Sequence, residues 1–258
     1  MTQAVFCKLP DRAFIYVSGT DRFDFLQGLI TQDAHLLKSQ NLIYSCLLTP
    51  NGKFLFDFFV FEDNDQLVID CEGGERANAL LKRLSMFKLR SDVTLELADD
   101  VDVFQIFRHC EEQNDATIQN DAYFKDPRFD GYRAHPPMSS PRRRGSVSSV
   151  SIDSRLRGEG GIAETSFKIW DTYRIRAEIP DGSRDLIPEK SFLHESEIIT
   201  KTAVSYDKGC YMGQELVSRM HHRGLVKKQL RCVEIDNIPE NTELRSKCGD
   251  IGLALIKP

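Results

Sequence analysis

One octapeptide concentrates the residue types that do chemistry: Lys208-Gly209-Cys210-Tyr211-Met212-Gly213-Gln214-Glu215. It places the thiol of Cys210 between two glycines and two positions after a lysine. The thiolate form of cysteine attacks electrophiles and binds soft metals, and a nearby cation or a helix N-terminus favours that form. The pattern therefore predicts a nucleophilic or cluster-handling thiol at Cys210.

The residues that follow predict a helix over about 211–223. Apolar side chains at 216, 217 and 220 form one helical stripe, and Gly224 follows a basic last turn as a stop signal. Cys210 would then lie at the positive end of this helix. A metal site made of Cys210, His221 and His222 is the alternative, but its spacing is unlike known zinc patterns, and we predict no metal site. The other cysteines are expected to be small buried hydrophobes: Cys7, Cys46, Cys71, Cys110, Cys232 and Cys248.

The octapeptide resembles the K-G-C-[FY]-x-G-Q-E signature of the YgfZ-type folate-binding proteins, which are relatives of the aminomethyltransferase (T-protein) of the glycine cleavage system. Other segments that resemble blocks of this family occur in the family's order along nearly the whole chain. They lie at 17–33, 48–54, 126–133, 179–189 and 219–224.

The resemblance implies an α+β chain with an aminomethyltransferase (T-protein)-like folate-binding fold, in which two α+β subdomains and a C-terminal β-barrel surround a central site. After residue 228 only a short stretch remains, so the barrel is expected to be abbreviated. The predicted division is an N-terminal α+β subdomain (1–137), a disordered Ser/Arg/Gly-rich insertion (138–164), the remainder of the folate-binding region with the signature (165–228) and a shortened barrel segment (229–258). A composition like that of the insertion buries too little apolar surface to order itself.

Trp170 is the only tryptophan of the chain and the second predicted site residue. The resemblance implies that it contacts folate, and a pterin ring can stack on an indole face. An anchoring role in the core is the alternative for Trp170. Another tryptophan of the family is replaced here by Arg12. Within the signature, the resemblance implies that Cys210 is joined by ligand-binding or loop-fixing residues: Lys208, Gly209, Tyr211, Gly213, Gln214 and Glu215.

The function implied by the resemblance is that of a tetrahydrofolate-binding accessory protein for assembly or repair of iron–sulfur clusters. Its partners would be client enzymes, tRNA-modifying enzymes among them, and assembly proteins. One thiol cannot hold a stable cluster, for which about four thiolates are typical, so a partner must supply the rest. Two alternatives stay open. One is a folate-dependent aminomethyltransferase, in which a carboxylate orients the reacting amine. The other is an RNA-binding adaptor that uses Arg142–Arg144 and the basic residues near Lys227.

Composition restricts the remaining classes. The chain has 258 residues, 41% of them hydrophobic, and no apolar run approaches the roughly 18 residues that span a bilayer, so we expect no membrane association. The net charge of −5 argues against non-specific nucleic-acid binding as the main role. Seven cysteines without a CxxC pair and without an apparent signal peptide predict a cytoplasmic protein that lacks disulfides.

Hydrophobic periodicity predicts a mixture of short strands and helices with largely antiparallel pairing. Two helices are expected, at 21–37 and 75–87, before a third near Trp170. Asn51-Gly52 predicts a type I′ turn between two strands. The expected strands cover 13–17, 42–48, 54–61, 66–71, 93–97, 101–107, 231–235 and 251–256.

Overall fold

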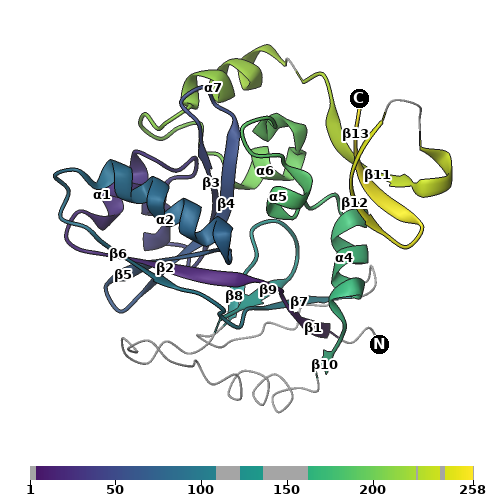
Figure 1. Cartoon of the computed structure of the whole chain (residues 1–258), viewed down its shortest axis with the longest axis horizontal. Helices are drawn as coiled ribbons and strands as arrows, with labels where there is room; N and C mark the ends of the chain where they lie inside the picture. The colour runs from purple at the N-terminus through teal and green to yellow at the C-terminus, as the bar shows by residue number, and fades with distance from the viewer. Residues whose placement is uncertain (1–3, 109–122, 136–161, 225, 239–241, 258) are drawn as a thin grey trace.

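The computed structural model describes residues 4–108, 123–135, 162–224, 226–238 and 242–257. These residues form two five-stranded sheets and one three-stranded sheet, joined by short helices (Figure 1). The predicted insertion falls almost wholly outside the described ranges. The division into four segments stays a prediction. No helix within the described part of the chain is long and apolar enough to cross a membrane.

The first large sheet is antiparallel and has the strand order β3-β4-β5-β2-β6. Successive side chains of a strand point to opposite faces, and both faces of this sheet are covered, which explains why its strands are almost continuously apolar. One face packs on α1 (Arg22–Gln27) and α2 (Glu75–Lys88), which lie together at the left of Figure 1. The other face joins the core shared with the rest of the molecule. The strands are β2 (Arg12–Ser18), β3 (Ile43–Leu48), β4 (Phe54–Asp63), β5 (Gln66–Glu72) and β6 (Thr94–Ala98).

The second sheet has the order β10-β1-β7-β9-β8 and lies beside the first. Its strands are short, and only the β1–β10 pairing is parallel. They are β1 (Ala4–Lys8), β7 (Phe104–Arg108), β8 (Tyr123–Lys125), β9 (Tyr132–Ala134) and β10 (Ala163–Glu164).

Helical segments lead from the second sheet to the C-terminal sheet. Helix α4 packs against β12 and β13 and also reaches β1, so it stands between the two sheets in Figure 1. The C-terminal sheet has the order β11-β13-β12 and occupies the segment for which a shortened barrel is predicted. The segments are α4 (Phe167–Arg176), α5 (Gly182–Asp185), η2 (Leu193–Glu195), α6 (Glu197–Thr202), α7 (Gln214–Arg223), β11 (Gln229–Glu234), η3 (Ile235–Asn237), β12 (Glu243–Cys248) and β13 (Ile251–Ile256).

The prediction of one long helix over 21–37 is wrong. Helix α1 stops at Gln27, and a separate 3₁₀ turn, η1 (Ala34–Lys38), follows. Between them Ile30 forms a β-bridge with Leu47, and the hydroxyl of Thr31 donates to the carbonyl of Ala203 at 2.6 Å. These tertiary contacts therefore prevent a continuous helix here, although the spacing of the apolar residues favours one.

The hairpin predicted at Asn51-Gly52 is confirmed, since β3 and β4 pair antiparallel, but its turn is not type I′. A type I′ turn needs positive φ at both central residues, but only Gly52 has it, with φ of 73°. The backbone N–H of Thr49 donates to the carbonyl of Lys53 at 2.8 Å, which closes a wider turn between β3 and β4. This turn packs against the signature segment.

Candidate functional site

The signature forms a loop that leads into α7. Helix α7 begins at Gln214, three residues later than predicted, because Gly213 adopts a left-handed conformation with φ of 82° that a helix cannot continue through. Cys210 therefore precedes the helix cap and does not lie at the positive end of the helix as predicted. Its side chain is exposed.

Lys208 anchors this loop to the segment after α1. Its Nζ donates to the carbonyls of Ile30 and Gln32, both at 2.9 Å. Burial lowers the pKa of Lys208 to about 8, since a charged amine loses solvation in a half-buried position. The N–H of Met212 donates to the carbonyl of Gly28 at 3.3 Å. The lysine therefore fixes the loop, and its amine is directed to carbonyl oxygens.

The two glycines beside Cys210 differ in role. A Cβ on Gly213 would lie 2.6 Å from the carbonyl oxygen of Thr49 and 3.0 Å from the Cα of Gly52. A Cβ on Gly209 would meet no atom within 4 Å. Of the two glycines, Gly213 is the one in close contact with another segment, where the signature packs on the β3–β4 turn.

The remaining signature residues differ in burial. Tyr211 is buried in the shared core, and burial raises the pKa of its hydroxyl. The backbone N–H of Gln214 donates to the carbonyl of Tyr211 at 3.2 Å. Glu215 is exposed and forms an ion pair with Arg219 on the next turn of α7. Within the octapeptide, the exposed residues are Gly209, Cys210 and Glu215.

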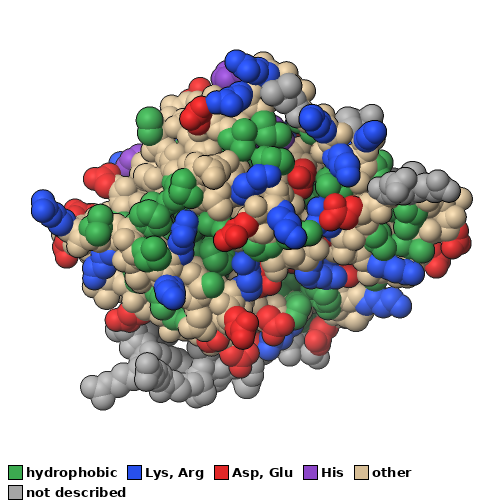
Figure 2. Space-filling view, turned by 45° about the horizontal axis from the view of Figure 1, so that its top comes forward, with side chains coloured by type: hydrophobic (Ala, Val, Ile, Leu, Met, Phe, Trp, Pro, Cys, Tyr) green, Lys and Arg blue, Asp and Glu red, His purple; other side chains and the backbone are tan. Residues whose placement is uncertain are grey.

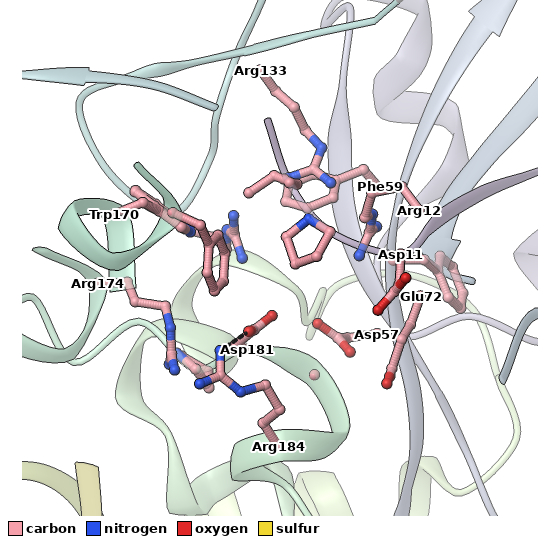
Figure 3. Close-up of a pocket in the computed structure, with 17 residues that line it drawn as sticks. Asp11, Arg12, Asp57, Phe59, Glu72, Arg133, Trp170, Arg174, Asp181 and Arg184 are labelled. Carbon is pink, nitrogen blue, oxygen red and sulfur yellow. Dashed lines mark hydrogen bonds and ion pairs between the residues drawn. The ribbon is translucent and has the colours of Figure 1, made fainter. Parts of the chain in front are cut away.

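A cavity of about 110 Å³ lies apart from this loop and contains Trp170 in its wall (Figure 3). Residues 208–215, all described, do not line it. The structure thus separates the two predicted sites, which share one apolar core. The lining residues come from distant parts of the chain: Leu9, Pro10, Asp11, Arg12, Asp57, Phe58, Phe59, Glu72, Arg128, Arg133, Phe167, Trp170, Arg174, Pro180, Asp181, Gly182 and Arg184.

Trp170 also packs in an aromatic cluster. Its ring is 3% exposed and lies 5.2 to 5.8 Å, between ring centroids, from Phe107, Phe129 and Tyr173. The alternative role as a core anchor therefore has clear structural support. The indole both holds α4 against the second sheet and forms part of the cavity wall.

Five arginines line the cavity, and most are matched by carboxylates. Arg174 donates to Asp171 and Asp185, both at 2.6 Å, and Arg128 donates to Asp126 at 2.9 Å. Arg12 donates to Asp70 at 2.6 Å. These pairs hold the guanidinium groups rigid, as buried charges require.

Asp57 supplies a partly buried carboxyl group to the same cavity. The hydroxyl of Tyr44 donates to it at 2.7 Å. Burial raises the pKa of Asp57, and Glu72 beside it acts in the same direction, whereas Tyr44, Arg12 and Arg128 oppose the shift. Figure 3 shows Asp57, Glu72 and Asp11 on one side of the cavity. This arrangement can accept hydrogen bonds from the N–H groups of a ligand.

The charged cavity residues were not predicted as site residues. Arg128 and Arg133 lie in the 126–133 block, and Pro180 to Arg184 continue from the Ile179-Pro180 block, so the same family-like segments could have indicated them. Their pairing could not be predicted, because their partners lie on other strands and helices.

The surface around α7 is basic. Arg219, His221, His222 and Arg223 are exposed on this helix, and Lys227 follows it. Figure 2 shows Lys and Arg side chains spread over the upper part of this face. The Arg142–Arg144 segment proposed for RNA binding lies outside the described residues.

Comparisons with known proteins agree with the predicted resemblance. The chain is 29% identical over 246 residues to the mouse protein named iron–sulfur cluster assembly factor IBA57, mitochondrial. This alignment covers 89% of this chain and 66% of the relative. It is 28% identical over 272 residues to the IBA57 homologue of Aspergillus oryzae, and the alignment covers 90% of this chain and 57% of that relative. It is 29% identical over 254 residues to the homologue of Pyricularia oryzae, with 94% of this chain and 61% of that relative covered. The family resemblance is confirmed. No family model matches the chain. The chain spans only about three fifths of the length of the two fungal relatives.

The fold is also confirmed. The glycine cleavage system aminomethyltransferase T of Bartonella henselae superposes with a TM-score of 0.71 over 99% of this chain and 79% of the other, at 13% sequence identity. The chain therefore has the α+β aminomethyltransferase-like fold.

The predicted cytoplasmic localisation is contradicted. The three IBA57 relatives are all named as mitochondrial proteins. The prediction relied on cysteine usage and the apparent lack of a signal peptide, and a reducing environment does not distinguish between compartments.

Proposed function

We propose that this protein is an accessory factor for assembly or repair of iron–sulfur clusters, with Cys210 as its reactive thiol. The observation that carries the proposal is the exposure of Cys210 on a loop fixed by Lys208 and Gly213. The relatives named as iron–sulfur cluster assembly factors support it. A thiolate suits iron and sulfide ligation, and a fixed, accessible loop can present it to a partner protein.

A cluster would be cargo here, and its other ligands would come from a partner. Among the residues that the structure describes, no group of three His, Cys, Asp or Glu side chains is placed to hold a metal ion. About four ligands, mostly thiolates, usually hold a cluster. We therefore propose assembly proteins and client enzymes, including tRNA-modifying enzymes, as the partners.

We assign tetrahydrofolate to the cavity. The residues present fit this ligand, since Trp170 offers an apolar ring, Asp57 accepts hydrogen bonds and the arginines can bind anionic groups. When bound, a reduced folate supplies a carrier for one-carbon units. The protein's own part is to exclude water with its aromatic wall and to hold the ligand between fixed charges.

The thiol assignment is tested in cells that lack their own copy of the protein. We expect the chain with Cys210→Ser to leave the activity of a [4Fe–4S] client enzyme as low as in cells without any copy. Cys232→Ser, a change at a partly buried thiol of β11, is the matched control and should restore activity. Restored activity with Cys210→Ser would remove the thiol from the proposal.

Asp57 favours a second candidate function, a folate-dependent aminomethyltransferase. A partly buried carboxyl group with a raised pKa, in the same cavity as the assigned folate, is suited to orient a reacting amine. This candidate predicts tetrahydrofolate-dependent release of ammonia from an aminomethylated carrier, lost in Asp57→Asn. No release by the wild-type chain would exclude it.

A further inference from the structure

The buried carboxylate of Asp70 ties together two arginines of the cavity wall. Asp70 lies on β5 with no exposed surface. One of its oxygens accepts hydrogen bonds from Nε and Nη2 of Arg12 at 2.8 and 2.6 Å. The other accepts from Nε of Arg133 and lies 3.0 Å from Nε2 of His135. Because Arg12 belongs to the first sheet and Arg133 to the second, one carboxylate joins both sheets behind the cavity.

Arg133 keeps one donor group without a partner. Its Nε binds Asp70, and its Nη1 donates to Oε1 of Gln105 at 3.3 Å. Its Nη2 is buried and has no hydrogen-bond partner. The side chain is only 2% exposed, and its guanidinium carbon lies 4.2 Å from the ring centroid of Phe59, which also lines the cavity. A buried donor without an acceptor costs about 1–3 kcal/mol, so a ligand oxygen here would remove a penalty.

The surrounding charges favour an anion as that acceptor. Asp70 is a single negative charge shared by Arg12 and Arg133. Burial lowers the pKa of His135, so this third neighbour of Asp70 is neutral at pH 7. Taken alone, Asp70, Arg12, Arg133 and His135 therefore sum to one positive charge, and the carboxyl of Asp57 acts on the Arg12 end of this group.

Besides Asp70, the charged groups that act most on the pKa of Arg133 are two like charges, Arg12 and Arg128. Arg12 and Arg128 are the cations that act on the carboxyl of Asp57, and Arg184 pairs with Asp181 at 2.7 Å. Figure 3 shows Arg133 on the side of the cavity opposite Asp181 and Arg184. At this corner Arg133 therefore has one carboxylate partner, Asp70, which it shares with Arg12, and two further cations that act on it.

We propose that Nη2 of Arg133 forms a carboxylate-binding subsite of this cavity. The inference rests on the proposed folate binding and deepens it, because folates carry a glutamate with free carboxylates and a pterin carries none. A guanidinium with one fixed edge and one free donor binds a carboxylate with defined geometry. The subsite thus selects ligands by their acidic tail, while Trp170 and Asp57 lie in other parts of the wall.

The test compares two probes by calorimetry and by Trp170 fluorescence: tetrahydrofolate, and 6-methyltetrahydropterin, which keeps the reduced pterin but has no glutamate. We expect the wild-type chain to bind tetrahydrofolate at least about 10-fold more tightly than the pterin. Arg133→Gln should weaken tetrahydrofolate binding by about 10-fold or more and change pterin binding by less than about 2-fold, as loss of one charged hydrogen bond implies. Arg22→Gln is the control, because Arg22 is partly buried, pairs with Glu62 and lies outside the cavity.

The outcomes separate the two proposals. If Arg133→Gln weakens both probes equally, or neither, the subsite is wrong while folate binding stands. If the wild-type chain binds the pterin and tetrahydrofolate equally well, the subsite is again wrong, and this comparison decides the matter even if Arg133→Gln does not fold. If the wild-type chain binds neither probe, both the folate assignment and the subsite are overturned.

Discussion

The signature loop and the cavity differ in how they hold their functional groups. The loop exposes the thiol of Cys210, and Lys208, Tyr211 and Gly213 fix its backbone. The cavity buries its reactive groups and holds them by charge pairs, above all at Asp70 and Arg174. An exposed thiol suits transfer between proteins, whereas a buried charged wall suits recognition of a small ligand.

Strand β3 connects the two regions. Tyr44 and Cys46 are two positions apart and point to the same face of the sheet. Tyr44 donates to Asp57 in the cavity, and Cys46 lies close enough to Tyr211 of the signature to act on its pKa. The regions can therefore be perturbed separately, but a change in β3 would reach both.

The largest expected effect is on the cavity side. Asp70→Ala leaves Arg12 and Arg133 buried without their shared carboxylate, and should lower the free energy of unfolding by about 3–5 kcal/mol. Denaturant titration at pH 7 measures it. Glu62→Ala, which removes the half-exposed partner of Arg22, is the control and should cost about 0–1 kcal/mol. Equal costs for the two variants would show that the cavity charges are not held as described.

The same carboxylate gives this side of the molecule an acid dependence. Its arginine neighbours hold the pKa of Asp70 well below the usual value. A depressed pKa stabilises the fold at pH values above the unfolded-state pKa of about 4, and this contribution is lost as the pH falls toward the lower folded-state value. The difference between the wild-type chain and Asp70→Ala should therefore shrink below about pH 4.

A smaller effect is expected in the signature loop. Gly213→Ala places a Cβ 2.6 Å from the carbonyl of Thr49 at a φ of 82°, so we expect a loss of about 2–3 kcal/mol. Gly209→Ala, in the same loop but with open space around it, should change stability by less than about 0.5 kcal/mol. Matching losses in the two variants would contradict the close packing of Gly213 on the β3–β4 turn.

Sequence reasoning found the loop far better than the cavity, for a physical reason. The octapeptide is contiguous, so Cys210 and its glycines can be identified without knowledge of the fold. The cavity forms only when Arg12, Asp57 and Trp170 come together from two strands and one helix, and no local sequence pattern predicts that arrangement. Most strand positions were predicted, since alternation and β-branched runs are local signals. The prediction of one long first helix was wrong because the hydroxyl of Thr31 donates a hydrogen bond to the carbonyl of Ala203, which is distant in the sequence.

The smallest expected effect on stability is at Cys210 itself. Cys210→Ser changes an exposed side chain and should alter the free energy of unfolding by less than about 0.5 kcal/mol. When the folded Cys210→Ser variant reacts with a thiol reagent, it should show one fewer fast-reacting thiol than the folded wild-type chain. Cys46→Ser, at a fully buried site of β3, should keep the fast-reacting group and lose about 1–3 kcal/mol. If both variants kept the fast-reacting group, the accessible thiol would lie elsewhere, and the loop would lose the property that distinguishes it from the cavity.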